Sequence, residues 1–139
     1  LTQKDFQHTI TDNTVNDKPL YYFKNSKDFT VPNDAGQVLL ANCSNVTIKD
    51  LFLQKTDFSI ILGYCTNCLI ENVSIYDTDG EICLFKSDNC TMKNNKLYRN
   101  LHGICLDYHS NYNIIKNNLE GGDTECQQEM EQDREAWAR

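Results

Sequence analysis

Apolar and polar residues alternate along most of this chain, and the alternating pattern returns with a period of about 22 residues, which lies within the range of solenoid repeats. Successive repeats begin at Asn45, Asn67, Asn89 and Asn111, and this register needs no gap. Within each repeat the apolar residues lie two apart, which is the spacing of strands with one buried face. The pattern is therefore typical of a solenoid, in which each unit packs only against its neighbours.

Aligned positions of successive repeats, called stacks below, predict three short strands per repeat, separated by corners. Asparagine suits the corners because it tolerates left-handed backbone. The predicted core stacks are Ile48/Ile70/Met92/Ile114, Leu53/Ile75/Leu97/Leu119, Ile60/Ile82/Ile104 and Leu62/Leu84/Leu106. The predicted corner stacks are Asn45/Asn67/Asn89/Asn111 and Asp50/Asn72/Asn94.

Charged residues support the same register. Two stacks alternate in sign, Lys49/Glu71/Lys93 and Lys55/Asp77/Arg99, as expected for side chains about 4.8 Å apart in a parallel coil. We therefore predict an all-β fold, a right-handed parallel β-helix of about four coils. A leucine-rich-repeat horseshoe is the alternative, but the second half of each repeat alternates where a horseshoe needs a helical spacing.

The repeats divide the chain into three predicted parts, an N-terminal cap (1–22), the β-helix (23–122) and an acidic helical tail (123–139). In the cap, the alternation of Phe6, His8 and Ile10 predicts a strand that covers the open end of the solenoid. The first coil is degenerate, with Asp28–Val31 expected one full repeat before Asp50–Leu53, and Gln37–Leu40 one full repeat before Ser59–Leu62. In the tail, Thr124 resembles a capping residue and Trp137 is expected to dock on the last coil.

Charge and hydropathy exclude several classes of function. The 139 residues carry a net charge of −7 and no basic stripe, so we expect no nucleic-acid partner. The sequence has no signal peptide and no apolar run that approaches the length needed to cross a bilayer, so we expect no membrane span. The chain begins at Leu1, which predicts a piece of a longer polypeptide.

The runs PLYYFKNSKDFTVPNDAGQVLLANCSNVTIKDLFL, GYCTNCLIENVSIYDTDGEICLF and HGICLDYHSNYNIIKNN resemble the NosD-like β-helical repeat domains over roughly residues 14 to 120. The resemblance implies a right-handed β-helix of the carbohydrate-binding and sugar-hydrolase type, as in surface proteins of methanogens. It also implies an extracellular or cell-surface location, periplasmic in a bacterium, with a glycan and further domains of a longer surface protein as partners. The family takes its name from a periplasmic copper-maturation factor, but such a scaffold does not specify a function.

Four cysteines are expected to gather on adjacent coils, namely Cys43, Cys65, Cys68 and Cys90. Soft sulfur ligands suit Cu(I) or zinc. Buried free thiols and disulfides between stacked cysteines are the alternatives.

Carboxylates cluster before the third strand of the repeat, where Asp57, Asp79 and Glu81 are the candidate acids of a polysaccharide hydrolase or lyase. Asp57 and Asp79 share a stack, so the two charges need a shared proton or a cation such as calcium. The Asn-Thr-Asp, Asp-Asp and Gly-His-Gly motifs of polygalacturonases are missing. A solvated loop tip is the alternative.

Tyrosines supply the last candidate site. Tyr76 and Tyr98 share a stack and can present flat faces to a sugar ring, with Tyr64 and Tyr108 as further candidates. Structural stacking alone also explains them. We therefore predict a non-catalytic, carbohydrate-binding scaffold without a required cofactor. A fragment of a hydrolase or lyase and a NosD-type copper-handling protein remain the alternatives.

Overall fold

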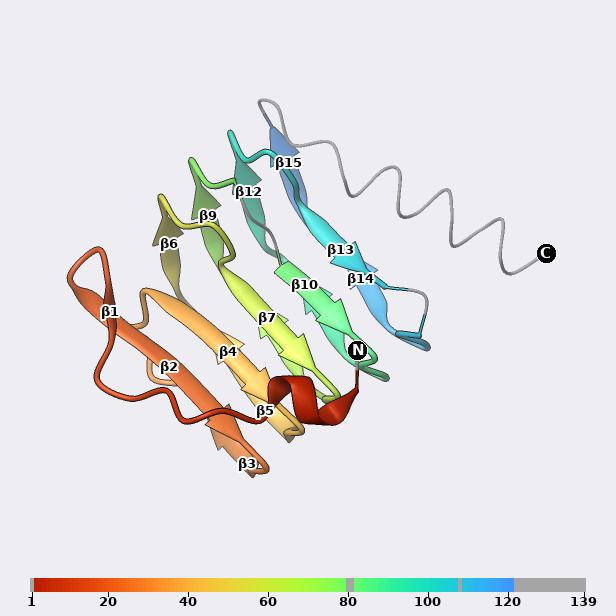
Figure 1. Ribbon diagram of the computed structural model, residues 1–139. Coiled ribbons are helices and arrows are strands. Elements are labelled where there is room, and N and C mark those ends of the chain that lie inside the picture. The colour runs from red at the N-terminus through yellow and green to blue at the C-terminus, as the bar shows by residue number, and fades with distance from the viewer. Residues whose placement is uncertain (1, 80–81, 108, 122–139) are drawn as a thin grey trace.

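The computed structural model describes residues 2–79, 82–107 and 109–121, and it is built almost entirely of short strands stacked in three sheets (Figure 1). Neighbouring strands are parallel except for the antiparallel pair β1–β2. The first face holds β1 (Thr14–Val15), β2 (Lys18–Lys24), β4 (Gln37–Ala41), β7 (Ile60–Gly63), β10 (Ile82–Phe85) and β13 (Ile104–Leu106). The second face holds β3 (Lys27–Thr30), β5 (Ser44–Lys49), β8 (Leu69–Glu71), β11 (Thr91–Lys93) and β14 (Ile114–Lys116). The third face holds β6 (Phe52–Gln54), β9 (Ser74–Tyr76), β12 (Lys96–Tyr98) and β15 (Leu119–Gly121).

The predicted parallel β-helix with its stacked coils is confirmed. Ile48 pairs with Ile70, and Ile70 pairs with Met92, and all three side chains are fully buried in a narrow central core. The second half of each repeat forms β7 and β10, so the horseshoe alternative is wrong. Each coil buries its inward-facing residues against the coils on either side, as a solenoid requires.

The corners have left-handed backbone, as predicted. Asn45, Asn67 and Asn89 have φ of 52°, 56° and 56°. The other predicted corner stack, Asp50/Asn72/Asn94, is also left-handed, and so is the charged stack Lys55/Asp77/Arg99. Short polar side chains tolerate this conformation best, because they can bond locally to the backbone or to the next coil. The amide of Asn72, for example, donates to the Asp50 carboxylate at 2.8 Å.

The last coil departs from the predicted register by a single position. Met92 pairs with Ile115 and Leu97 pairs with Glu120, so the predicted core positions of Ile114 and Leu119 are wrong. Their side chains are 52% and 54% exposed. The insertion lies between positions 106 and 110, because Leu106 still pairs with Leu84 as predicted, whereas the Ser110 hydroxyl accepts from the amide of Ser87 and not of Asp88. The corner predicted at Asn111 accordingly falls at Tyr112, with φ of 59°.

The first coil is shorter than predicted. Phe29 pairs with Val46 and not with Leu51, so the predicted full repeat between Asp28–Val31 and Asp50–Leu53 is wrong. The predicted register is confirmed further on, where Val38 pairs with Ile60. Within the described residues the third face begins only at β6, in the following coil. The β1–β2 turn covers the free edge of β6, because the Asn16 amide donates to the Gln54 carbonyl at 2.6 Å.

The N-terminal segment covers a side of the solenoid. The predicted strand around Phe6 is wrong, since Gln3–Phe6 form the 3-10 helix η1. The Phe6 ring lies on the outer surface of the first face, against Gly63, with its centroid 5.8 Å from that of Tyr64 and 5.9 Å from that of Phe85. Any side chain at Gly63 would collide with this ring. The predicted helical tail, with Thr124 and Trp137, lies outside the described residues, and within those residues no helix is long and apolar enough to span a membrane.

Candidate functional site

Three aromatic rings form a continuous stack on the outer surface of the third face. The Phe52 and Tyr76 centroids lie 5.4 Å apart, and the Tyr76 and Tyr98 centroids lie 5.5 Å apart with an interplanar angle of 13°. These rings point outward because the alternate positions, Leu53 and Ile75, fill the core. We call Phe52, Tyr76 and Tyr98 the aromatic stack. It is the feature that the sequence predicted from Tyr76 and Tyr98.

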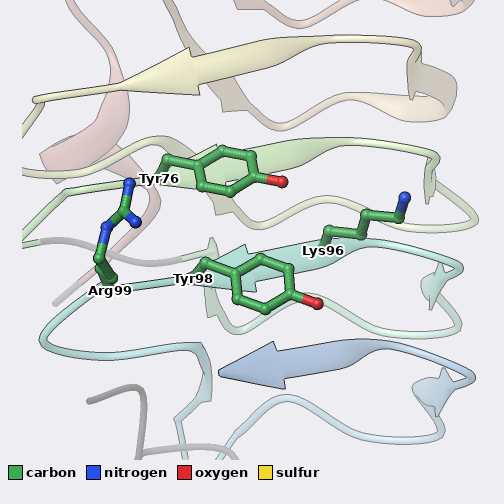
Figure 2. Close-up of a pocket in the computed structure, with 4 residues that line it drawn as sticks. All are labelled: Tyr76, Lys96, Tyr98 and Arg99. Atoms are coloured by element: carbon green, nitrogen blue, oxygen red, sulfur yellow. The ribbon is translucent and has the colours of Figure 1, made fainter. Parts of the chain in front are cut away.

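Gly121 makes room for the Tyr98 ring at the end of the aromatic stack. A Cβ at Gly121 would come within 2.5 Å of the Tyr98 ring, so the ring lies directly over the Gly121 backbone. Figure 2 shows the two phenol rings side by side on successive coils, with both hydroxyls pointing the same way. They border an open hollow of about 480 Å³, whose other described lining residues are Lys96 and Arg99.

Arg99 is held in place at the corner beside the hollow. Its Nε donates to Asp77 Oδ1 at 2.7 Å and its Nη2 donates to Asp77 Oδ2 at 3.2 Å, which confirms the predicted attraction in this charged stack. The Arg99 hydrogen bonds, helped by the charge of Lys55, lower the pKa of Asp77, and the same bonds raise the pKa of Arg99. The pair is exposed to solvent, so it orients the two side chains more than it stabilises the fold.

The structure places Tyr64, another predicted tyrosine, away from this site. Tyr64 lies at the corner after β7, where its ring contacts Phe6 and the Lys86 amino group lies 5.5 Å from the ring centroid. Tyr108 lies outside the described residues. Sequence reasoning missed Phe52 as a member of the aromatic stack and Lys96 and Arg99 as residues that line the hollow. Strand alternation could have indicated that Phe52 and Lys96 point outward, because they lie two positions before the outward residues Gln54 and Tyr98.

The four predicted cysteines do come together inside the core. Their sulfur atoms form a chain, because S–H contacts link Cys65 to both Cys43 and Cys68, and link Cys68 to Cys90. Each side chain is at most 2% exposed, and all four are free thiols. Each thiol also donates to the backbone carbonyl two positions earlier, at 3.4 or 3.5 Å.

The chain of thiols sets which sulfur ionises most readily. Hydrogen bonding with the sulfur atoms of Cys65 and Cys90 lowers the pKa of Cys68. Hydrogen bonding with the neighbouring sulfur atoms, together with burial, raises the pKa of Cys65 and of Cys90. A single negative charge in this chain would therefore settle on Cys68, between two donors.

The predicted acidic site is only partly described. Asp57 and Asp79 are exposed on neighbouring loops, and the Asp79 amide donates to the Thr56 carbonyl at 3.3 Å. Glu81 lies outside the described residues. Among residues 2–79, 82–107 and 109–121, no three His, Cys, Asp or Glu side chains converge in a way that could hold a metal ion. The catalytic role of these acids stays a prediction.

Together, the three-faced solenoid and its exposed aromatic stack define a small parallel β-helix protein with a candidate ligand-binding face. A family model described as "Periplasmic copper-binding protein (NosD)" matches residues 6–126. The chain belongs to this family, which confirms the NosD-like resemblance and makes it a β-helix protein of a periplasmic family. No curated protein and no solved structure matches the chain.

The family description raises the question of whether the four core cysteines could bind copper. Thiolate sulfur is a ligand that Cu(I) prefers. The thiols of this chain, however, are sealed in the core and already donate to backbone carbonyls. Binding would require their deprotonation and an entry path through the packed coils. The four cysteines therefore do not fit a copper site in this fold, and the arrangement is that of buried structural thiols.

Proposed function

We propose that this protein is a non-catalytic β-helix scaffold of the periplasm or cell surface that binds carbohydrate on its third face. The observation that carries the proposal is the aromatic stack, which is solvent-accessible although aromatic side chains are normally buried for their large apolar area. Phe52 alone leaves 47% of its surface exposed. The periplasmic family supports the location.

The chemistry of the face suits a sugar polymer. The apolar C–H faces of a sugar ring pack well on aromatic rings, and the phenol hydroxyls of Tyr76 and Tyr98 donate to and accept from sugar hydroxyls. The hollow is open, whereas sites for small molecules usually enclose most of the ligand surface. An open row of rings that continues over several coils favours an extended glycan, which can contact one ring after another.

The test is a glycan screen read both for binding and for release of products. We expect Tyr98→Ala to weaken binding of each retained glycan at least about fivefold, because a well-packed aromatic contact contributes about 1 kcal/mol or more. Tyr112→Ala is the matched control, since Tyr112 is 83% exposed and lies at a corner away from the third face. Equal binding by wild type and Tyr98→Ala would reject the site.

The hydrolase or lyase alternative is an outcome of the same screen. Release of shortened sugars, lost in Asp79→Asn, would assign the function to the acids on the loop beside Thr56. Binding without turnover, unaffected by Asp79→Asn and reduced by Tyr98→Ala, supports the proposal.

A further inference from the structure

Cationic side chains surround the aromatic stack, although the chain as a whole carries a charge of −7. The Lys18 amino group lies 6.0 Å from the Phe52 ring centroid, at the first coil of the stack. Lys96 and Arg99 line the hollow beside the tyrosines, and no carboxylate is among its described lining residues. The local charge is therefore opposite in sign to that of the molecule.

The two lining cations differ in their availability. Arg99 is engaged by Asp77 through two hydrogen bonds, so these two charges largely neutralise each other. Lys96 is exposed, and its amino group has no hydrogen bond or ion pair with another described residue. Figure 2 shows this amino group on the side toward which the Tyr76 and Tyr98 hydroxyls point. An unpaired ammonium group and two phenol hydroxyls thus border one open hollow.

This combination selects for charge as well as for ring shape. An ammonium group has three donors and no acceptor, and hydrogen bonds between ions are about twice as strong as those between neutral groups. A neutral sugar can only hydrogen-bond to the Lys96 ammonium group, whereas a carboxylate or sulfate on the sugar would also attract its charge. We infer that the glycan bound on the third face is anionic, with a sugar ring on Tyr76 and Tyr98 and its carboxylate or sulfate on Lys96.

This inference rests on the proposed function and narrows its ligand class. Aromatic rings with nearby cations also bind single-stranded nucleic acid, which requires a positively charged groove along the backbone. The third face offers one unpaired lysine in its described hollow, on a protein of net charge −7. One lysine is enough to pair with a single acidic group on a sugar, but it cannot follow a phosphate at every nucleotide, so the third face lacks the groove that a nucleic acid needs.

The experiment compares matched pairs of ligands on the intact protein by calorimetry. One pair is tetragalacturonate and its methyl ester, and the other is a heparin tetrasaccharide and its desulfated form. We expect the anionic member of at least one pair to bind more tightly, and we expect this advantage to shrink as salt is raised, because the lysine is exposed. The pair that responds distinguishes recognition of carboxylate from recognition of sulfate.

Variants assign the effect to the lysine. Lys96→Gln should weaken binding of the anionic member about two- to fivefold, the range for an exposed charge pair, and leave the neutral member unchanged. Lys96→Arg should restore binding. Lys116→Gln is the control, since it removes the same charge from an exposed position on β14 of the second face. Equal losses in Lys96→Gln and Lys116→Gln would indicate non-specific attraction and would overturn the inference.

The outcomes separate this inference from the proposed function. If neutral and anionic members bind equally and Tyr98→Ala weakens both, the face binds glycans but the anionic preference is refuted. If no member of either pair binds, both the inference and the proposed function are rejected for these ligands. Tighter binding of oligothymidylate than of any sugar would also overturn both.

Discussion

Buried polar side chains at the corners hold successive coils together, and Asn100 is the best test of this role. Its Oδ1 accepts hydrogen bonds from the Thr78 amide and hydroxyl, both at 3.0 Å, in the coil above. Its Nδ2 donates to the Ile75 carbonyl at 2.9 Å. Asn100 is 1% exposed, so water cannot easily replace these bonds when the side chain is removed.

Asn100→Ala should cost about 3 kcal/mol of unfolding free energy, since its hydrogen bonds to the Thr78 amide, the Thr78 hydroxyl and the Ile75 carbonyl are lost at about 1 kcal/mol each. Leaving the Thr78 amide and Ile75 carbonyl unsatisfied in the core sets a range of about 2–5 kcal/mol. The melting temperature should fall by about 10 °C for a folded unit of this size. Urea unfolding followed by far-UV circular dichroism, with a thermal scan alongside, measures both quantities.

Asn111→Ala is the matched control. Asn111 is exposed, and its side chain makes no hydrogen bond with another described residue, so its loss should cost less than about 0.5 kcal/mol. A cost for Asn100→Ala below about 1 kcal/mol, or one no larger than that of the control, would refute the idea that these amides tie the coils together.

Three further predictions concern the site and the thiols. Gly121→Ala should displace the Tyr98 ring, since a Cβ would lie 2.5 Å from it, and should lower glycan affinity with little change in unfolding free energy; unchanged affinity in calorimetry would contradict the flat stack. Arg99→Gln should raise the pKa of Asp77 toward its ordinary 3.8 in a carboxyl NMR titration. Because folding lowers the pKa of Asp77, the contribution of the Asp77–Arg99 pair to stability is present above pH 3.8 and is lost as the pH falls through the pKa of the folded state. If Arg99→Gln left the pKa of Asp77 unchanged, the ion pair would be refuted. Iodoacetamide should not modify the four core thiols (Cys43, Cys65, Cys68 and Cys90) in the native protein but should modify them after denaturation. Peptide mapping that finds them modified in the native protein would show that the core opens. Cu(I) uptake by the native protein should be the same in wild type and in Cys65→Ser.

The central coils could be predicted from the sequence because their stacks repeat both residue type and spacing. The register of the last coil could not be predicted, because two pairs of identical neighbouring residues conceal the one-residue insertion. Ile114 and Ile115 are identical in type, as are Asn117 and Asn118, so these positions do not distinguish the uninterrupted register from the one shifted by a single position. Leu119 matches the Leu97 stack better than Glu120 does, so the residue types favour the uninterrupted register. Hydrogen bonds decide between the two registers, since the Asn95 amide bonds to Asn118 and not to Asn117.

The candidate site was predictable to the extent that it follows from strand alternation. Tyr76 and Tyr98 were found because they occupy one stack, and the four cysteines were found for the same reason. Phe52 was missed because it joins the rings diagonally, from a position that aligns with Ser74. Such a contact depends on how a long side chain leans along the strand, which the period of the sequence does not contain.

The corners at Asn45, Asn67 and Asn89 have the same left-handed backbone, and the strands that follow them pair in register. The repeat unit that starts at Asn67 and ends before Asn89 therefore has ends that match its neighbours. Duplicating that repeat unit in the gene would insert one more copy of the ring supplied by Tyr76, in line with the existing three. On the proposed function, the number of repeat units would set the length of glycan that the third face can contact. Each added unit would increase avidity without any new kind of contact.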